Sequence, residues 1–251
     1  MQRYYIESTF QLGDIITLDP NDHHHLTRVM RAKVGTELEL VHQGQVFLGH
    51  LMSFDKNESK IKVIEKLNAR HTELPVEVVI AVGLSKNDKL DWIAQKGTEC
   101  GMSMLIPLEL KRNVVKWSTG KQNKRVERLS KIVKEATQQS QRLLVPKIEP
   151  LMSIDQIIQY SDDFEVKLIA YEEEAKNERT SNLKSQLQSI AKGDQVIMVF
   201  GSEGGLDSLE IEKLKGAGFV SCSLGPRILR AETAPIYFLS ALSYELELTE
   251  K

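Results

Sequence analysis

The chain has 251 residues, 41% of them hydrophobic and 27% charged, with a formal net charge of −2. This composition suits a folded protein with a real core, in one large domain or in a small and a medium one. No apolar run approaches the roughly 20 residues of a membrane span, and the first residues lack a secretory signal core. Cys100 and Cys222 have no metal-binding or disulfide spacing. We therefore expect a cytoplasmic protein with reduced thiols and no membrane segment.

Charge is distributed unevenly along the chain. Residues 110–150 contain 11 Lys or Arg and three acids, whereas residues 151–212 contain 13 acids and five bases. A local basic stretch is the electrostatic footprint of a phosphate backbone, although a solvated helix face has the same composition. Composition alone leaves both interpretations open.

The first 71 residues are predicted to be rich in β-strand. Strand-like pieces fall at 15–18, 37–41, 46–54 and 60–65, with turn signals between them, such as Asp19-Pro20-Asn21. One helical stretch, at about 24–31, interrupts them. Several short strands with little helix indicate a small barrel. The polar segment 67–75 is typical of a linker.

From residue 74 onward, strands alternate with helices. Strands are predicted at 76–82, 104–107, 166–171, 195–200 and 219–224, and helices at 88–100, 121–141, 181–191, 207–216 and 233–248. This alternation predicts an α/β domain with a mostly parallel sheet covered on both faces. Ligands of such sheets bind at the carboxyl ends of strands, so the loops there are the candidate sites.

The first candidate loop, residues 200–206, follows a strand and precedes a helix. Asp207 and Glu210 resemble an N-cap and its capping-box partner. Three glycines allow the backbone to approach a ligand closely. The loop matches neither a P-loop nor Gly-x-Gly-x-x-Gly, which argues against a nucleotide- or NAD-dependent enzyme. A tight strand-to-helix turn is the alternative, although such a turn has no need of the Glu203 carboxylate.

The second candidate loop, residues 224–235, also joins a strand to a helix. Thr233 or Glu232 can cap that helix, and Pro235 fits its first turn. Arg227, Arg230 and Glu232 lie at the start of a largely apolar helix. Buried charges are costly unless paired, so the alternatives are a functional site and a structural Arg–Glu pair.

A run of histidines, His23-His24-His25, lies in the N-terminal region. Neighbouring helical residues point in different directions, and no carboxylate or Cys is at ligand spacing, so we predict no metal site. The better functional interpretation is a helix that presents Arg28 and Arg31 to phosphates, and a solvated helix face is the alternative.

Both loops resemble the signature loops of a known family. Gly201-Ser-Glu-Gly-Gly205 and Leu224-Gly-Pro-Arg-Ile-Leu-Arg-Ala-Glu-Thr-Ala234 resemble those of the family that methylates N3 of a uridine in 16S ribosomal RNA, within the SPOUT superfamily of knotted methyltransferases. Segments 24–31, 86–101 and 128–146 resemble further family motifs, in order. The chain departs from the pattern at Ser202 (usually Pro), Leu206 (usually Phe) and Asn87 (usually Gly), which affects loop rigidity more than chemistry.

The resemblance implies a fold and an assembly. Residues 1–72 would be a PUA-like β-barrel that grips RNA, and residues 73–251 a SPOUT methyltransferase domain with a C-terminal trefoil knot, an exception to normal chain topology. It also implies a homodimer packed through the knot region, S-adenosylmethionine as cofactor, and the small ribosomal subunit as partner, with no metal or membrane.

The resemblance also implies site residues. The end of the strand before the first loop, residues 169–172 with Glu172 last, would close one wall of the cofactor site. The expected cofactor-binding residues are Ile169, Ala170, Tyr171, Phe200, Gly201, Ser202, Glu203, Gly204, Gly205, Leu224, Gly225, Arg227, Ile228, Leu229, Arg230, Thr233 and Ala234. The expected RNA-binding residues are His24, Arg28, Arg31, Arg112, Lys121, Lys124, Arg125 and Arg128.

The chemistry requires a positioned base and the loss of a proton. N3 of uracil is a pairing position, so the base must be presented unpaired. Arg230 is expected to stabilise negative charge on the uracil carbonyls, and Glu203 or Glu232 to accept the proton or to orient Arg230. Two alternatives remain: a non-catalytic RNA-binding assembly factor, and a related methyltransferase that acts on a ribose 2′-oxygen or on transfer RNA.

Overall fold

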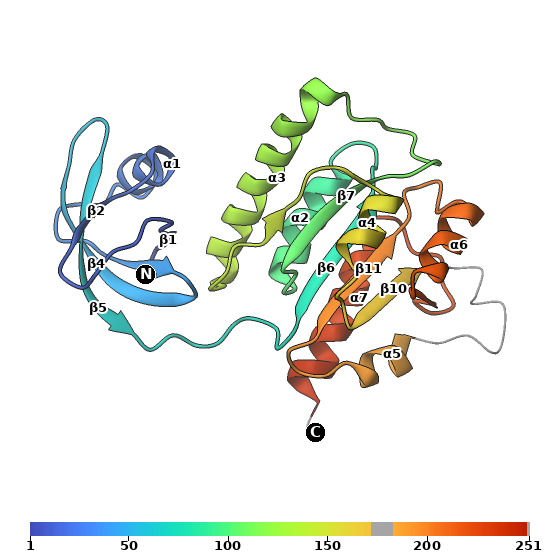
Figure 1. The fold of residues 1–251 in the computed structure, drawn as a ribbon. Helices are drawn as coiled ribbons and strands as arrows, with labels where there is room; N and C mark the ends of the chain where they lie inside the picture. The colour runs from blue at the N-terminus through green and yellow to red at the C-terminus, as the bar shows by residue number, and fades with distance from the viewer. Residues whose placement is uncertain (172–182, 250–251) are drawn as a thin grey trace. The chain divides into compact units, whose positions relative to one another are not determined.

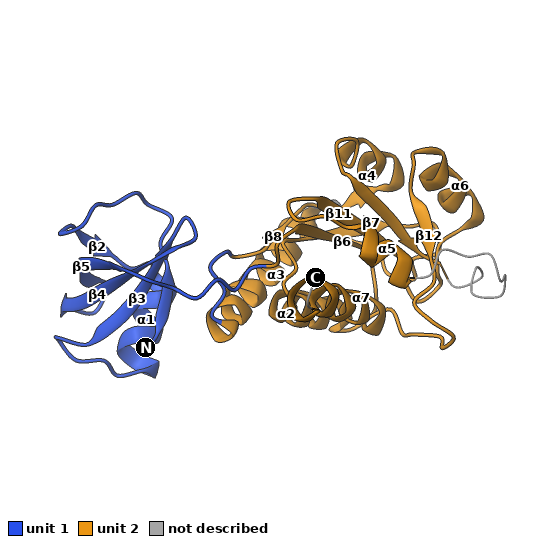
Figure 2. Cartoon of the chain, turned by 90° about the horizontal axis from the view of Figure 1, so that it is seen from below, with its two compact units in different colours: residues 1–73, 141–144 blue, residues 74–140, 145–251 orange. Residues whose placement is uncertain are grey.

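The computed structural model describes residues 1–171 and 183–249, and the chain divides into two compact units (Figures 1 and 2). The first unit consists of Met1–Glu73 and Gln141–Leu144, and the second of Leu74–Ser140 and Val145–Lys251. Each unit has its own hydrophobic core.

The first unit is built on a curled sheet. Its strands are β1 (Arg3–Tyr5), β2 (Ile15–Thr17), β3 (Glu37–His42), β4 (Gln45–Phe54) and β5 (Ser59–Leu67), in the order β1-β3-β4-β5-β2. The pairing of β4 with β5 shifts register at two places, one beside Gly49, and such bulges bend a sheet. A Cβ at Gly49 would lie 2.7 Å from Ile61, so only glycine lets the strands curl this closely. Within the described residues, the end strands β1 and β2 are not hydrogen-bonded to each other. The sheet is therefore curled but not closed, whereas the sequence predicted a small barrel.

The helix of the first unit begins earlier than predicted. Helix α1 (Pro20–His24) continues as a π-helical turn over His25–Val29. The Asp19 carboxylate accepts hydrogen bonds from the N–H groups of Asn21 and Asp22, at 2.8 and 2.9 Å. The prediction of a turn here was wrong because Asp followed by Pro is also a helix-start signal, with Asp at the N-cap and Pro at the first helical position.

A short segment after the long basic helix completes the first unit. Arg142 is only 4% exposed, and its Nε donates to Glu73 at 3.0 Å. The same carboxylate accepts from the Leu143 N–H at 2.7 Å, while the Leu143 side chain packs against Val41 and Val46. Arg142 therefore does not belong to an exposed basic stripe, although it contributes to the charge of residues 110–150.

The second unit contains a parallel sheet. Its strands are β6 (Glu77–Gly83), β7 (Met104–Glu109), β8 (Lys147–Ile148), β9 (Met152–Ser153), β10 (Val166–Ala170), β11 (Gln195–Phe200) and β12 (Val220–Cys222). The order is β12-β10-β11-β6-β7-β8, with β9 also pairing with β7, and every pairing is parallel. The prediction of a mostly parallel sheet is confirmed. The two-residue strands β8 and β9 were not predicted, because two residues carry no periodicity.

Helices cover both faces of this sheet (Figure 2). One face packs against α2 (Lys89–Glu99), α3 (Thr119–Ser140), α5 (Leu183–Ser189) and α7 (Thr233–Ser243), and the other against α4 (Ile154–Tyr160) and α6 (Ser208–Gly216). Strand β6 shows the reason: Val78 and Ile80 face one core and Val79 and Ala81 the other. Helix α7 continues as a π-helical turn over Tyr244–Leu248.

The strand order creates a switch point. From β6 the chain continues to β7 on one side, and from β11 it continues to β12 on the other, so the strand order reverses between β11 and β6. Crevices at such points, outside the carboxyl ends of the strands, are where open α/β sheets bind ligands. Ala170 and Tyr171, at the end of β10, and the loops that follow β11 and β12 lie at this edge.

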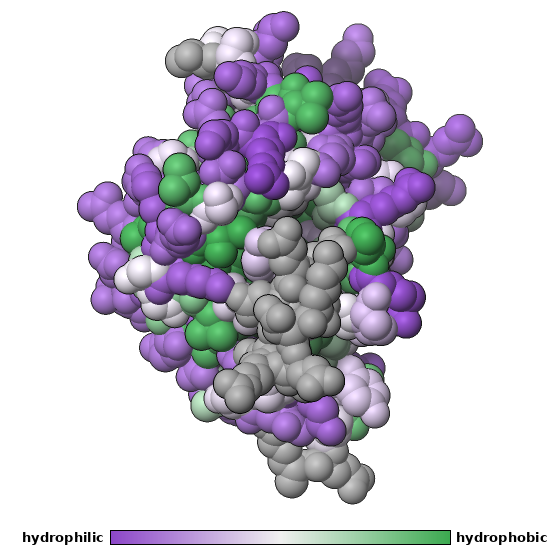
Figure 3. All heavy atoms as spheres, turned by 90° about the vertical axis from the view of Figure 1, so that its right-hand side faces the viewer, coloured by the Kyte–Doolittle hydropathy of each residue, from purple (hydrophilic) through white to green (hydrophobic). Residues whose placement is uncertain are grey.

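Hydrophilic residues cover most of the face drawn in Figure 3, and hydrophobic residues form smaller areas between them. Among the helices of the described residues, none has the length and apolar character needed to cross a membrane.

Candidate functional site

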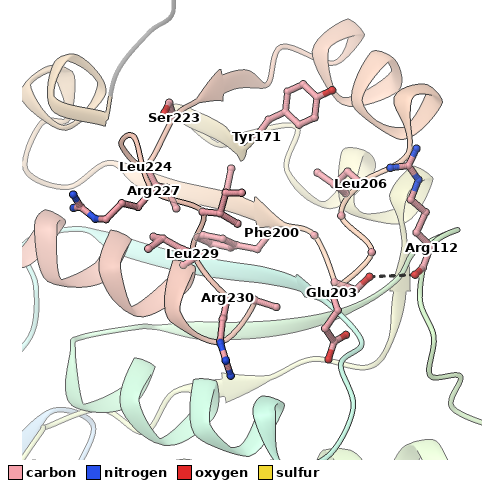
Figure 4. A pocket seen from close by; sticks show the side chains of 18 of the residues that line it. Arg112, Tyr171, Phe200, Glu203, Leu206, Ser223, Leu224, Arg227, Leu229 and Arg230 are labelled. Carbon is pink, nitrogen blue, oxygen red and sulfur yellow. Dashed lines mark hydrogen bonds between the residues drawn. The ribbon is translucent and has the colours of Figure 1, made fainter. Parts of the chain in front are cut away.

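A cavity of ≈ 760 Å³ lies at the carboxyl ends of β10, β11 and β12 (Figure 4). Its volume falls within the roughly 300–1,000 Å³ typical of small-molecule sites. Loop 200–206 and loop 223–231 form most of its wall. The structure brings these predicted residues together around it: Ala170, Tyr171, Phe200, Gly201, Ser202, Glu203, Gly204, Gly205, Leu224, Gly225, Arg227, Ile228, Leu229, Arg230 and Ala234.

Other predicted residues do not line this cavity. Ile169 is fully buried in the core beside α4 and α6, and Thr233 is exposed on the first turn of α7. Glu232 does not line the cavity, although it pairs with Lys89, which does, and Glu172 lies outside the described residues. The cavity also includes Leu206, the last residue of the first candidate loop, and residues that were not predicted as cofactor contacts: Lys89, Arg112, Ser208, Ser223 and Ala231.

Loop 200–206 is a tight turn as well as a cavity wall. The Gly205 N–H donates to the Ser202 carbonyl at 2.9 Å. A Cβ at Gly204 would lie 2.7 Å from the Arg112 carbonyl oxygen, and one at Gly201 would lie 2.8 Å from Gly205. These two glycines are therefore required by the packing of the chain on itself, whereas Gly205 has a φ of +73° and open space beside it. The loop is therefore a tight turn whose residues also line the cavity.

Helix α6 fixes the far end of the loop. Asp207 and Glu210 form the predicted capping box, with Glu210 accepting from the Asp207 N–H at 2.8 Å. Lys111 and Arg112 pair with Asp207 at 3.2 and 3.6 Å, and the Lys111 hydrogen bond is the main cause of the lowered pKa of Asp207. Arg112 also lines the cavity.

Lys89 joins the two acidic residues of the site. Its Nζ lies 3.1 Å from a Glu203 oxygen and 3.4 Å from Glu232 Oε2. The Lys86 N–H donates to the same Glu203 oxygen at 3.0 Å. Glu232 Oε2 is buried and, among the described residues, accepts no hydrogen bond. The charged cluster is therefore a lysine between two glutamates, and the structural Arg–Glu pair considered as an alternative is not formed among the described residues.

This cluster controls the ionisation of Glu203. Partial burial raises the pKa of Glu203, but hydrogen bonds from the backbone N–H groups of Glu203 and Lys86 and from the Lys89 ammonium outweigh it. The pKa of Glu203 is consequently below its ordinary value, and the hydrogen bond to Glu203 raises the pKa of Lys89. Both groups carry their charges at neutral pH.

Unlike Glu203 and Glu232, the two arginines of the second loop have no ion-pair partner among the described residues. Arg227 and Arg230 are both exposed. In Figure 4 the Arg230 side chain extends to the same side of the cavity as Glu203. Arg230 is thus a cation available to a bound anionic group.

The position of Lys89 in the sequence is itself a sign of this cluster. It occupies the first position of α2, where the helix dipole disfavours a cation. A lysine in that position is explained by partners elsewhere, here two carboxylates from loops more than 110 residues away. Asn87, two residues earlier, has a φ of +56°, which explains why glycine is usual in the family motif and why asparagine is tolerated.

The predicted RNA-binding residues are divided between the units. His24, Arg28 and Arg31 are exposed in the first unit, and Lys121, Lys124 and Arg125 are exposed on α3 in the second. Arg128 pairs with Asp88 at 3.3 Å and with Asp91, so its charge is largely compensated within the chain.

The histidine run forms no cluster. The His23 ring contacts the Ser59 hydroxyl at 2.7 Å, and the His25 ring contacts the Tyr4 hydroxyl at 3.1 Å, while His24 is exposed. Within the described residues, no group of three His, Cys, Asp or Glu side chains is arranged to hold a metal ion.

Comparisons with known proteins decide the family. A model of the RNA methyltransferase domain matches residues 72–243, and a model of the RNA methyltransferase PUA domain matches residues 18–64. The chain belongs to the RNA methyltransferase family. It is 43% identical to the ribosomal RNA small subunit methyltransferase E of Bacillus subtilis, over 99% of this chain and 98% of that protein.

Solved RNA methyltransferases have the same fold. The methyltransferase E of Neisseria gonorrhoeae, bound to S-adenosyl methionine, superposes with a TM-score of 0.84 at 27% identity, over 97% of each chain. A Legionella pneumophila structure in complex with its cofactor SAM superposes with a TM-score of 0.85 at 27% identity, over 96% of each chain.

Proposed function

We propose that this RNA methyltransferase transfers a methyl group from S-adenosylmethionine to N3 of a uridine in the 16S ribosomal RNA of the small subunit. The observation that carries the proposal is the cavity at the switch point, where both signature loops meet the Lys89–Glu203 pair. Related enzymes named for the small ribosomal subunit, and relatives solved with the cofactor, support it.

The cavity residues fit this cofactor. Phe200, Leu206 and Leu229 provide apolar wall for a flat heteroaromatic ring, while nothing obstructs the space beside Gly205 and Gly225. The same cavity has charged side chains for an amino-acid group. When bound, S-adenosylmethionine supplies a methyl group that its sulfonium has already activated.

The protein must then position the uracil and remove its N3 proton. Arg230 is placed to stabilise the negative charge that develops on the uracil carbonyl oxygens, which makes the proton easier to lose. Glu203 lines the cavity as a carboxylate and is the first candidate to accept that proton. Glu232 acts through Lys89, which it holds against Glu203. The new N–CH₃ bond forms as the S–CH₃ bond breaks.

The remaining roles are assigned to the two parts of the chain. Residues 1–72 act as the PUA-like RNA-binding domain, with His24, Arg28 and Arg31 toward RNA. Residues 73–251 act as the SPOUT domain, in which the C-terminal segment forms a trefoil knot and two copies associate as a homodimer. The match of an RNA methyltransferase PUA domain model to residues 18–64, and of an RNA methyltransferase domain model to residues 72–243, supports this division of roles. We place the activity in the cytoplasm.

The test is methyl transfer from labelled S-adenosylmethionine into small ribosomal subunits that lack the modification, with the product digested to nucleosides. We expect the label in 3-methyluridine. Label in a ribose-methylated nucleoside, or only in transfer RNA, would reassign the substrate. Failure to bind the cofactor would favour a non-catalytic assembly factor.

A further inference from the structure

A second cavity of ≈ 450 Å³ lies next to the segment that supports Glu203. It is formed by the end of the β6–α2 connection, the segment before α3, and one face of α3. Its lining residues are Ser85, Lys86, Asn87, Asp88, Leu90, Asp91, Val115, Trp117, Arg125, Arg128 and Leu129.

A short segment, residues 86–89, separates the two cavities. Lys86 and Asp88 line the second cavity, whereas Lys89 lines the first. The Lys86 N–H donates to Glu203 at 3.0 Å, and the Lys89 ammonium lies 3.1 Å from the same carboxylate. An extended ligand that occupies both cavities therefore needs to cross only this short segment.

The second cavity has positive charge that the chain does not neutralise. Arg128 is compensated by Asp88 and Asp91. Arg125 and Lys86 are exposed, and neither forms an ion pair with a described residue. The lining thus carries three cations against two carboxylates, and the two uncompensated cations are available to an anion.

The same cavity has an apolar side. Trp117 and Val115 are partly buried and pack against the main core, and they line the cavity with Leu90 and Leu129. Aromatic side chains beside uncompensated cations are the combination that binds single-stranded nucleic acid, because bases stack on the ring while phosphates pair with the cations.

We propose that this cavity binds the nucleotide adjacent to the target uridine, with its phosphate paired to Arg125 and Lys86 and its base against Trp117. The inference rests on the proposed function, because it assumes an unpaired RNA strand in the first cavity. Asn87 adds an amide, with donors and an acceptor, that can contact the edge of this base.

The kinetic test compares two charge removals on α3 in the full-length protein. Arg125→Gln removes a cation from the cavity, whereas Lys131→Gln removes another exposed cation of the same helix that does not line it. With small ribosomal subunits as substrate, we expect Arg125→Gln to raise KM about 10-fold or more, and Lys131→Gln to raise it about 2-fold at most. Equal effects of the two substitutions would overturn the proposal.

A binding test does not depend on methyl transfer. The chain has two tryptophans, so Trp92→Phe leaves Trp117 as the only indole. Pentauridylate, added up to about 1 mM in the presence of S-adenosylhomocysteine, should quench Trp117 fluorescence, and Arg125→Gln should weaken this binding about 10-fold. No quenching, or quenching that Arg125→Gln leaves unchanged, refutes the subsite.

The two tests separate this inference from the proposed function. Quenching that depends on Arg125, without any methylated uridine, keeps the subsite and rejects the assigned reaction. Normal formation of 3-methyluridine, with no response to Arg125→Gln in either test, keeps the reaction and rejects the subsite.

Discussion

The ammonium of Lys89 lies 3.1 Å from the carboxylate of Glu203, although the first residue begins α2 and the second follows β11. This ion pair connects the start of a helix to the loop at the switch point of the sheet. Glu232 approaches the same ammonium from the loop before α7, at 3.4 Å. Three separate connections of the second unit are thereby held together by one side chain.

Replacement of Lys89 by Met should shift the acid limb of the pH–activity profile to higher pH. In the native protein the pKa of Glu203 is below its ordinary value, so the carboxylate stays ionised as pH falls toward that pKa. Without the Lys89 ammonium, the pKa of Glu203 rises, because that ammonium helps to lower it in the native protein. Activity that requires the Glu203 carboxylate is then lost at a higher pH. The measurement is kcat/KM from about pH 3.5 to about pH 8, a range that includes the acid limb of the native protein.

A matched control for this experiment is Lys96→Met, on the same helix. Lys96 pairs with Glu99 at 2.8 Å, outside the cavity. Its profile should overlay that of the native protein. An unchanged acid limb in Lys89→Met would show that Glu203 is not the ionisation that limits turnover.

Arg230→Ala should abolish most methyl transfer and leave cofactor binding largely intact. Loss of a donor that stabilises developing charge costs about 10²–10³ in kcat. Arg227→Ala removes another exposed arginine from the same loop and should have a much smaller effect on kcat. Calorimetric binding of S-adenosylmethionine, together with single-turnover rates, separates the two roles. Normal turnover in Arg230→Ala would contradict the assignment.

Gly204→Ala should displace loop 200–206. The added Cβ would lie 2.7 Å from the Arg112 carbonyl oxygen, and backbone cannot yield as a flexible side chain does. We expect about 1–3 kcal/mol of destabilisation and weaker cofactor binding, measured by denaturant melts and calorimetry. Gly216→Ala, at the end of α6 with open space beside it, should not destabilise the protein. Equal stability of the two variants would argue against the packing role of Gly204.

Arg142→Met should destabilise the first unit strongly. It leaves the Glu73 carboxylate, 13% exposed, without its buried partner, a loss that typically costs about 3–5 kcal/mol. Arg128→Met breaks a more exposed pair and should cost about 1 kcal/mol or less. Urea denaturation followed by circular dichroism compares the two. A small effect of Arg142→Met would mean that Glu73 gains water or another partner.

Affinity for ribosomal RNA should fall steeply with salt if the exposed basic residues contact phosphates. Each phosphate contact contributes about 0.7 to the slope of log K against log salt concentration for single strands. Replacement of both Lys121 and Lys124 by Gln should reduce that slope by about 1–2. Filter binding at several salt concentrations measures it. An affinity independent of salt would leave the basic helix as a solvated face.

The sequence was most informative where chemistry and local structure coincide. The loops around Glu203 and Arg230 could be found because glycines, charges and the ends of strands occur together within a few residues. The capping box of Asp207 and Glu210 was visible for the same reason, since its partners are three residues apart. Periodicity sufficed for β6 and α3, which have long apolar patterns.

Relationships between distant residues were not accessible in this way. No local pattern indicates that Lys89 meets Glu203, or that Arg142 is buried against Glu73, because these pairs form only when separate segments are brought together. The composition of residues 110–150 could not distinguish Arg125, which forms no ion pair with a described residue, from Arg128, which is compensated by two aspartates.

The dependence of the first unit on Gln141–Leu144 has a consequence for how such a chain can evolve. A gene fragment that ends near residue 73 would encode a unit lacking the partner of Glu73 and the side chain that packs on Val41 and Val46. Exchange of this unit between proteins by a single recombination event would thus yield an incomplete fold. The two units are expected to be inherited together, and a change at residue 73 to be matched by a change at residue 142.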